Sequence, residues 1–230
     1  MYMNRNEAEV TLGRSDEFET MIDDWSKVQA LNAGFAAATL LQSYANPGRY
    51  TLFSRWVDRE ASIAAGRREA FKSFARSFIN SGLARPTRLT EAYESVLEVD
   101  RADAETSAST AERWVDFTLT TPNVAPAFEA YVRELGEVST QKAPGVLSVR
   151  LRRSVGSDTK YVMIVFASDR AVARGWLLTP EVQSLRQVHP MAQILSGSPS
   201  AEIHHVVKRY AGPALAEAAP AEAAAAQSTR

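Results

Sequence analysis

Three histidines are the side chains of this sequence that titrate near neutral pH, and two of them are adjacent. His204 and His205 fall in a strand-like run, so their side chains point to opposite faces of the strand. They cannot both bind one metal ion, and we expect no metal site. His204 could act as a proton acceptor near neutral pH; the alternative is one hydrogen-bonded and one exposed histidine. His189 precedes Pro190 in an expected loop and is a candidate for substrate binding.

A second group of candidate residues lies on one predicted strand, Arg113–Thr120. Asp116 and Thr118 share a face of this strand with Trp114, and the opposite face is apolar. Polar groups on the face away from the helices would point into a cavity, where they would hydrogen-bond polar atoms of a ligand, because buried polar groups need partners. The alternative is a solvated strand edge.

Composition excludes several kinds of chemistry. The 230 residues contain no cysteine, so disulfides, thiolate catalysis and cysteine metal sites are ruled out. Dinucleotide, phosphate-loop, zinc-protease and nucleophile-elbow motifs are also missing. A net charge of −1 argues against nucleic acid as a partner. No run is apolar enough to span a bilayer and the first residues do not form a signal peptide, so we expect a cytoplasmic protein without membrane contacts.

The sequence repeats itself at an offset of 111 residues. The matched residues are Gly34 and Gly145, Ser43 and Ser154, Tyr50 and Tyr161, and Asp58-Arg59 and Asp169-Arg170. Before each glycine, apolar residues recur at i, i+3, i+4, i+7 and i+10, starting at Phe18 and at Phe128, which predicts one amphipathic helix in each half.

The elements around these helices follow the same order twice. The expected strands are 7–13, 35–43, 50–56 and 91–99 in the first half, and 113–120, 146–152, 161–167 and 202–210 in the second; further helical stretches cover 58–80 and 169–188. Each half reads β-α-β-β-α-β, the ferredoxin-like order. We predict half-domains at 1–101 and 113–211, a linker at 102–112, and a disordered Ala/Pro-rich tail at 212–230.

The strands are apolar on both faces, as Tyr161–Ala167 illustrates. Helices cover one face, and the sheet of the other half is the obvious cover for the second. The fold class is therefore α+β, with two tandem ferredoxin-like half-domains whose antiparallel sheets pack into an α+β barrel of the dimeric type within one chain.

The run Tyr50–Ala61 (YTLFSRWVDREA), followed by Phe71, resembles the antibiotic biosynthesis monooxygenase family, in which an apolar strand leads into an acidic-Arg-Glu-Ala helix start. A weaker match to the same pattern begins at Tyr161, and the resemblance covers about residues 7–210. It implies an oxygenase that acts on an aromatic polyketide-type phenol or quinone, uses molecular oxygen and needs no cofactor. One alternative is a ring-opening oxygenase that takes reduced FMN or FAD from a separate flavin reductase. Another is a non-catalytic binding barrel, and a homodimer is possible.

The resemblance also suggests site residues. Trp176 stands where similar oxygenases place a cavity tryptophan, while its repeat-mate is Ala65, so we expect the active cavity in the second half. The alternative is that Trp176 packs in the core. Arg186 stands where haem-degrading relatives have a histidine, which disfavours haem degradation; it could bind an anionic group instead. Phe166, near the end of the strand in the weaker match, is a candidate for substrate contact.

Overall fold

The computed structural model describes residues 1–88, 90–104, 108–189 and 191–213. The chain divides into two compact units. The first unit contains residues 1–42, 46–90 and the segment from Val207; the second contains residues 43–45 and 91–206.

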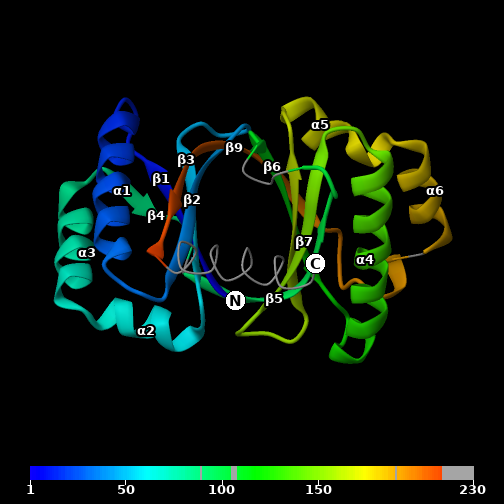
Figure 1. Ribbon diagram of the computed structural model, residues 1–230, viewed down its shortest axis with the longest axis horizontal. Helices are drawn as coiled ribbons and strands as arrows, with labels where there is room; N and C mark the ends of the chain where they lie inside the picture. Colours follow the sequence, from blue (N-terminus) through cyan, green and yellow to red (C-terminus); the bar gives the residue numbers. More distant parts are fainter. Residues whose placement is uncertain (89, 105–107, 190, 214–230) are drawn as a thin grey trace, which may run out of the picture. The chain divides into compact units, whose positions relative to one another are not determined.

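The first unit carries a ferredoxin-like arrangement of strands and helices. Its elements are β1 (Tyr2–Val10), α1 (Ser15–Ala30), β2 (Phe35–Ser43), β3 (Arg49–Trp56), α2 (Arg59–Arg67), α3 (Glu69–Ser81) and β4 (Ala84–Pro86). β3 pairs antiparallel with both β1 and β2, and β4 pairs with the end of β1. Helices α1 to α3 cover one face of these strands (Figure 1).

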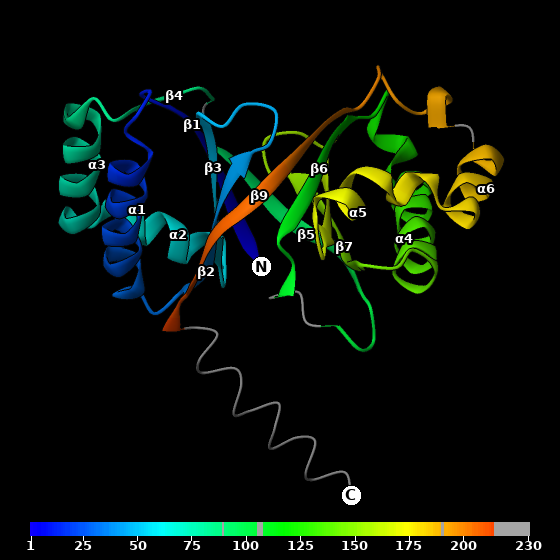
Figure 2. The ribbon, with the colours of Figure 1, turned by 90° about the horizontal axis from the view of Figure 1, so that it is seen from above.

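The second unit repeats this arrangement. Its elements are β5 (Glu91–Asp100), β6 (Ala111–Thr118), α4 (Ala125–Lys142), β7 (Val146–Ser154), β8 (Lys160–Ala167), α5 (Arg170–Gly175), α6 (Pro180–Val188) and β9 (Ser200–Ala211), with short 3-10 turns η2 (Pro122–Val124), η3 (Trp176–Leu178) and η4 (Met191–Gln193). The strand order is β9-β6-β8-β7-β5, all antiparallel. Helices α4 to α6 cover one face of the second unit's strands (Figure 2).

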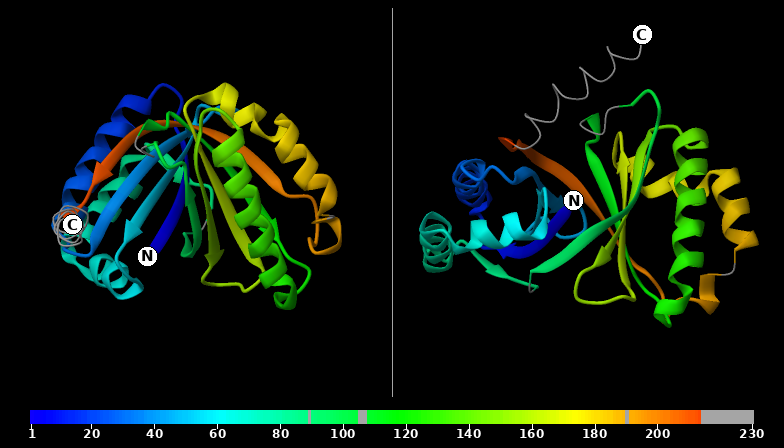
Figure 3. Two further views of the ribbon diagram at one scale, coloured as in Figure 1. Left: turned by 45° about the vertical axis from the view of Figure 1, so that its right-hand side comes forward. Right: turned by 60° about the horizontal axis from the view of Figure 1, so that its bottom comes forward.

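The predicted α+β class with two ferredoxin-like repeats is confirmed, and the closure of the two sheets into one barrel stays a prediction. The compact units divide the chain differently from the expected boundary. β5, expected to end the first half, pairs with β7 inside the second unit, where Leu97 is buried opposite Leu151. The last residues of β9, a long strand (Figure 3), belong to the first unit.

The expected tail begins inside the packed structure. The backbone N–H of Gly212 donates to the carbonyl of Ala36 at 2.8 Å, and Gly212 is buried. A side chain at Gly212 would overlap Phe35, so a residue without Cβ is required. The rest of the tail, residues 214–230, lies outside the described residues.

The repeated Gly and Asp residues position the helix that follows the hairpin. Asp58 and Asp169 are N-caps whose carboxylates accept from the backbone N–H of Ala61 at 2.7 Å and of Val172 at 2.9 Å. Gly145 has φ +84°, and a Cβ there would come within 2.7 Å of the Val172 side chain. The glycine therefore lets the helix start lie close against the preceding turn.

Candidate functional site

A cavity of about 330 Å³ lies inside the first unit, between the sheet and helices α1, α2 and α3. Ligand pockets usually span about 300–1,000 Å³, so this cavity could take one small molecule. Aromatic rings dominate its lining and come from Phe18, Trp25, Trp56, Phe71, Phe74 and Phe78.

The cavity exists because Ala65 supplies only a methyl group from α2. Ala65 is buried at 2% exposure and lines the cavity. Its repeat-mate Trp176 is also 2% exposed, but its ring is packed into the core of the second unit. The exchange of indole for methyl therefore leaves space in the first unit that is filled in the second.

The strands add a second difference between the units. Asn6 pairs with Leu52 and Ala8 with Tyr50 in the first unit. In the second unit the equivalent pairs are Val115 with Met163 and Phe117 with Tyr161. Smaller and more polar side chains thus face the helices in the first unit. Accordingly, Val115 and Phe117 pack into the core of the second unit, while Asn6 and Ala8 line the cavity of the first.

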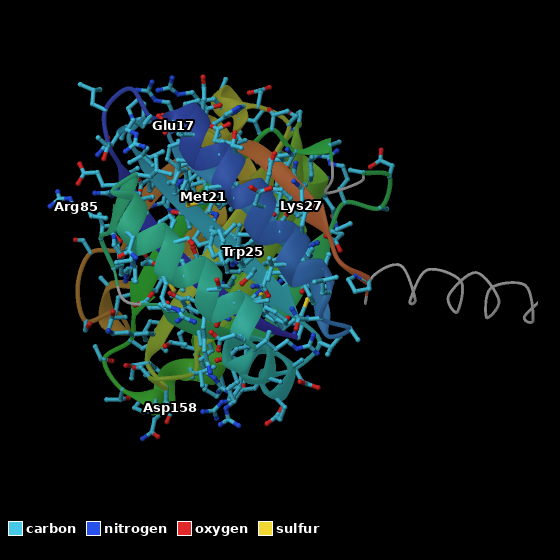
Figure 4. The ribbon with its side chains drawn as sticks, turned by 90° about the vertical axis from the view of Figure 1, so that its left-hand side faces the viewer. Glu17, Met21, Trp25, Lys27, Arg85 and Asp158 are labelled. Carbon is cyan, nitrogen blue, oxygen red and sulfur yellow. The ribbon has the colours of Figure 1, made fainter. Side chains whose placement is uncertain are left out.

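Helix α3 covers the cavity loosely. Phe71 and Phe74 line the cavity and stay partly exposed, whereas their repeat-mates Val182 and Leu185 on α6 are buried. Figure 4 shows α3 beside α1, where Trp25 is labelled. α3 therefore covers this side of the cavity with partly exposed side chains and has no fully buried residue.

Polar side chains occupy the strand side of the cavity and are already paired. Asn4 Nδ2 donates to Ser62 Oγ at 2.8 Å, linking β1 to α2. Asn6 Oδ1 accepts from Thr90 Oγ1 at 2.6 Å. Each amide keeps hydrogen-bonding capacity beyond these contacts, since an amide has two donor hydrogens and two acceptor lone pairs.

Two ionisable groups line the cavity. Burial is the main cause that raises the pKa of Tyr50 to about 12, and its hydroxyl donates to Glu19 at 2.9 Å, so it stays protonated at neutral pH. Glu7 also borders the cavity, but it lies between Asn6 and Ala8 on β1, so its side chain points to the opposite face of the sheet, where Arg5 Nη2 lies 2.6 Å from Glu7 Oε1. Neither group is therefore placed to act as a base in the cavity.

The structure places three of the expected site residues, Trp114, His204 and Phe166, around Glu112 in the second unit. The rings of Trp114 and His204 meet edge to face with centroids 5.7 Å apart, and both are 1% exposed. Trp114 Nε1 donates to Glu112 Oε2 at 2.9 Å. Phe166 pairs in register with Glu112, and the guanidinium of Arg150 lies 4.8 Å from its ring centre. This cluster lies on the face of the sheet opposite Val115 and the helices.

The other expected residues lie apart from this cluster. Asp116 is half-buried and Thr118 exposed, farther along β6. Arg186 is exposed on α6, and His189 lies after α6, where its Nε2 is 3.3 Å from Glu134. Within the described ranges, no group of three or more His, Asp or Glu side chains could hold a metal ion.

Trp176 and the cavity described above lie in different units. Trp176 was expected to line a ligand cavity in the second half, but it packs among core residues that include Val115, Leu135 and Val182. The cavity described above lies in the first unit. The small side chain of Ala65 was the feature of the sequence that could have indicated this space. Asn4 and Asn6 were missed because the strand was expected to begin at Glu7 and begins at Tyr2.

Among the described residues, no helix combines the length and the apolar composition needed to cross a membrane. The comparison with curated protein sequences gave no match. Similar solved structures include a Fusobacterium nucleatum protein named for a proposed monooxygenase activity, with 13% identity, 91% of this chain and 94% of that chain covered, and a TM-score of 0.72. An anthrone oxidase-like protein has 13% identity, 91% and 93% coverage and a TM-score of 0.64.

At these identities the structural likeness establishes the fold alone. The sequence gives the stronger assignment, because the family description "Antibiotic biosynthesis monooxygenase" matches residues 1–77 and 116–188. The two matched segments cover both repeats and most of the chain. The chain belongs to the antibiotic biosynthesis monooxygenase family, as a tandem form with two copies of the domain.

Proposed function

We propose that this protein is an oxygenase that binds an aromatic, polyketide-type phenol, anthrone or quinone in the cavity of the first unit. The observation that carries the proposal is the 330 Å³ cavity itself, where Ala65 leaves space among aromatic rings. Phe74 and the other rings offer flat apolar surface to a polycyclic ligand. Asn4 and Asn6 supply hydrogen bonds to its oxygens at the strand side.

The reaction needs no cofactor when the substrate supplies all the electrons. For an anthrone, loss of a proton from the CH₂ group gives an electron-rich anion that reacts with O₂. The carbon becomes a carbonyl with one oxygen atom, and the second oxygen leaves as water with the two hydrogens. Because the proton lost from the CH₂ group ends in the water molecule, the reaction needs no permanent proton acceptor, and the apolar walls exclude water from the anion.

Filling the cavity tests the proposal. Ala65→Trp places in the first unit the side chain that fills the same position in the second, and it should abolish oxygen uptake with 1,8-dihydroxyanthrone. Ala64 is exposed on the same helix, so Ala64→Trp is the matched control and should keep activity. Thermal unfolding checks that both variants fold. Equal oxygen uptake by Ala65→Trp and wild type, or uptake only with a flavin reductase system, would contradict the proposal.

A further inference from the structure

The side chain of Gln29 is a buried amide that the packing of the first unit does not satisfy. Gln29 lies on α1, is 0% exposed and lines the cavity. Its Nε2 has no hydrogen-bond partner among the residues that the structure describes. An unpaired buried donor costs about 1–3 kcal/mol, so its presence in a core requires an explanation.

The neighbour Asn32 fixes which end of this amide is free. Asn32 Nδ2 lies 3.3 Å from the carbonyl oxygen of Val28 and 3.1 Å from that of Gln29, so this atom must be the donor nitrogen. The same nitrogen lies 3.4 Å from Gln29 Oε1, which therefore is the acceptor oxygen of the glutamine. The Gln29 amide is thus held by its oxygen, and its NH₂ group is the part that it can offer to a ligand.

The second unit shows that this position does not need an unpaired donor. In the alignment of the two helices that matches Phe18 with Phe128, Gln29 corresponds to Ser139. Ser139 is also 0% exposed, and its hydroxyl donates to the carbonyl of Leu135 at 2.6 Å. Ser139 is satisfied within its own helix, in the unit where Trp176 fills the equivalent of the cavity. The unpaired amide and the open space occur together in the first unit.

We infer that Gln29 is a specificity-determining residue that donates a hydrogen bond from Nε2 to a carbonyl or phenolate oxygen of the aromatic ligand. The inference rests on the proposed function for the kind of ligand, and it adds the group that the ligand must carry. Because the donor is buried, a ligand of the same shape without an acceptor oxygen leaves it unpaired and binds less tightly.

Two ligands of equal shape test the inference without turnover. Anthrone carries the carbonyl, and 9,10-dihydroanthracene has CH₂ in its place. We expect anaerobic titration calorimetry to give a Kd for anthrone at least roughly tenfold below that for dihydroanthracene in the wild type. In Gln29→Met the two Kd values should become nearly equal, because the variant keeps the length of the side chain and removes the donor. Gln141 is exposed near the end of α4, so Gln141→Met is the matched control and should keep the wild-type preference.

Folding and turnover are measured separately. Gln29→Met should unfold at the wild-type temperature or above it, and Gln29→Ser, which copies the second unit, serves the same titration if the methionine variant does not fold. Equal Kd values for both ligands in wild type, an unchanged preference in either Gln29 variant, or no binding of either ligand overturns the inference. A preference without oxygen uptake supports Gln29 as the donor and contradicts only the oxygenase reaction. Oxygen uptake without a preference for anthrone supports the oxygenase reaction and contradicts the role of Gln29 as the donor.

Discussion

Replacing Trp176 with alanine should destabilise the second unit and leave ligand binding intact. The ring is 2% exposed and packed in the core with Leu135 and Val182. Truncating a buried tryptophan costs about 3–5 kcal/mol. For a chain of this size, each kcal/mol of lost stability lowers the thermal unfolding midpoint by about 2–4 °C. The midpoint of the transition in which the second unit unfolds should therefore fall by about 6–20 °C.

A milder substitution separates packing from hydrogen bonding. Trp176 Nε1 is buried without a hydrogen-bond partner among the described residues. Trp176→Phe removes this unpaired donor and keeps most of the ring contacts, so it should cost much less than Trp176→Ala. Indole added to the alanine variant should raise its midpoint by filling the space left by the ring, as apolar cavities bind apolar molecules of matching size.

The assays are calorimetric unfolding and anthrone titration of the folded variants. Trp176→Ala should bind anthrone with the wild-type Kd, because the cavity lies in the first unit. A loss of affinity in folded Trp176→Ala would refute this reasoning and return Trp176 to the ligand site. A loss of less than about 1 kcal/mol of stability would show that the ring is not packed as described.

Two further predictions concern the first unit. Hydrogen bonds from Lys208 at 2.6 Å and then from Tyr210 hold the pKa of Asp23 below its usual value, so this contribution is present above the unfolded pKa of about 4 and is lost as pH falls through the folded pKa. Asp23→Asn should therefore lower the free energy of unfolding at pH 7 and make it depend less on pH in the acid range. Urea unfolding of both proteins at pH 7 and pH 3 measures this. A difference in stability between wild type and variant that is as large at pH 3 as at pH 7 would contradict the prediction. Gly82 ends α3 with φ +60°, so Gly82→Ala should destabilise by about 1 kcal/mol through backbone strain alone, and an unchanged urea midpoint would speak against it.

The sequence by itself determined the local structure of both repeats. The apolar spacing from Phe18 predicted α1, and the strand expected at Phe35–Ser43 has those bounds in the structure. Asp58 and Asp169, found as repeat-mates, are helix N-caps, and Arg59 and Arg170 are the first residues of the helices. These features depend on residues within a few positions of one another, so their periodicity and capping chemistry can be read directly from the chain.

Only the tertiary structure decided where a ligand fits. The strand expected at 91–99 is β5 (Glu91–Asp100) in the structure, yet its pairing with β7 in the second unit joins residues that are 48 to 61 positions apart in the chain. The cavity depends on the small volumes of Ala65 and Ala8, which leave space between them and the surrounding aromatic rings. The volume of such a cavity depends on how side chains from several elements pack together, so it cannot be predicted from any single segment of the sequence. The same holds for Gln29, whose chemistry follows from being buried beside a cavity rather than from its place in a motif.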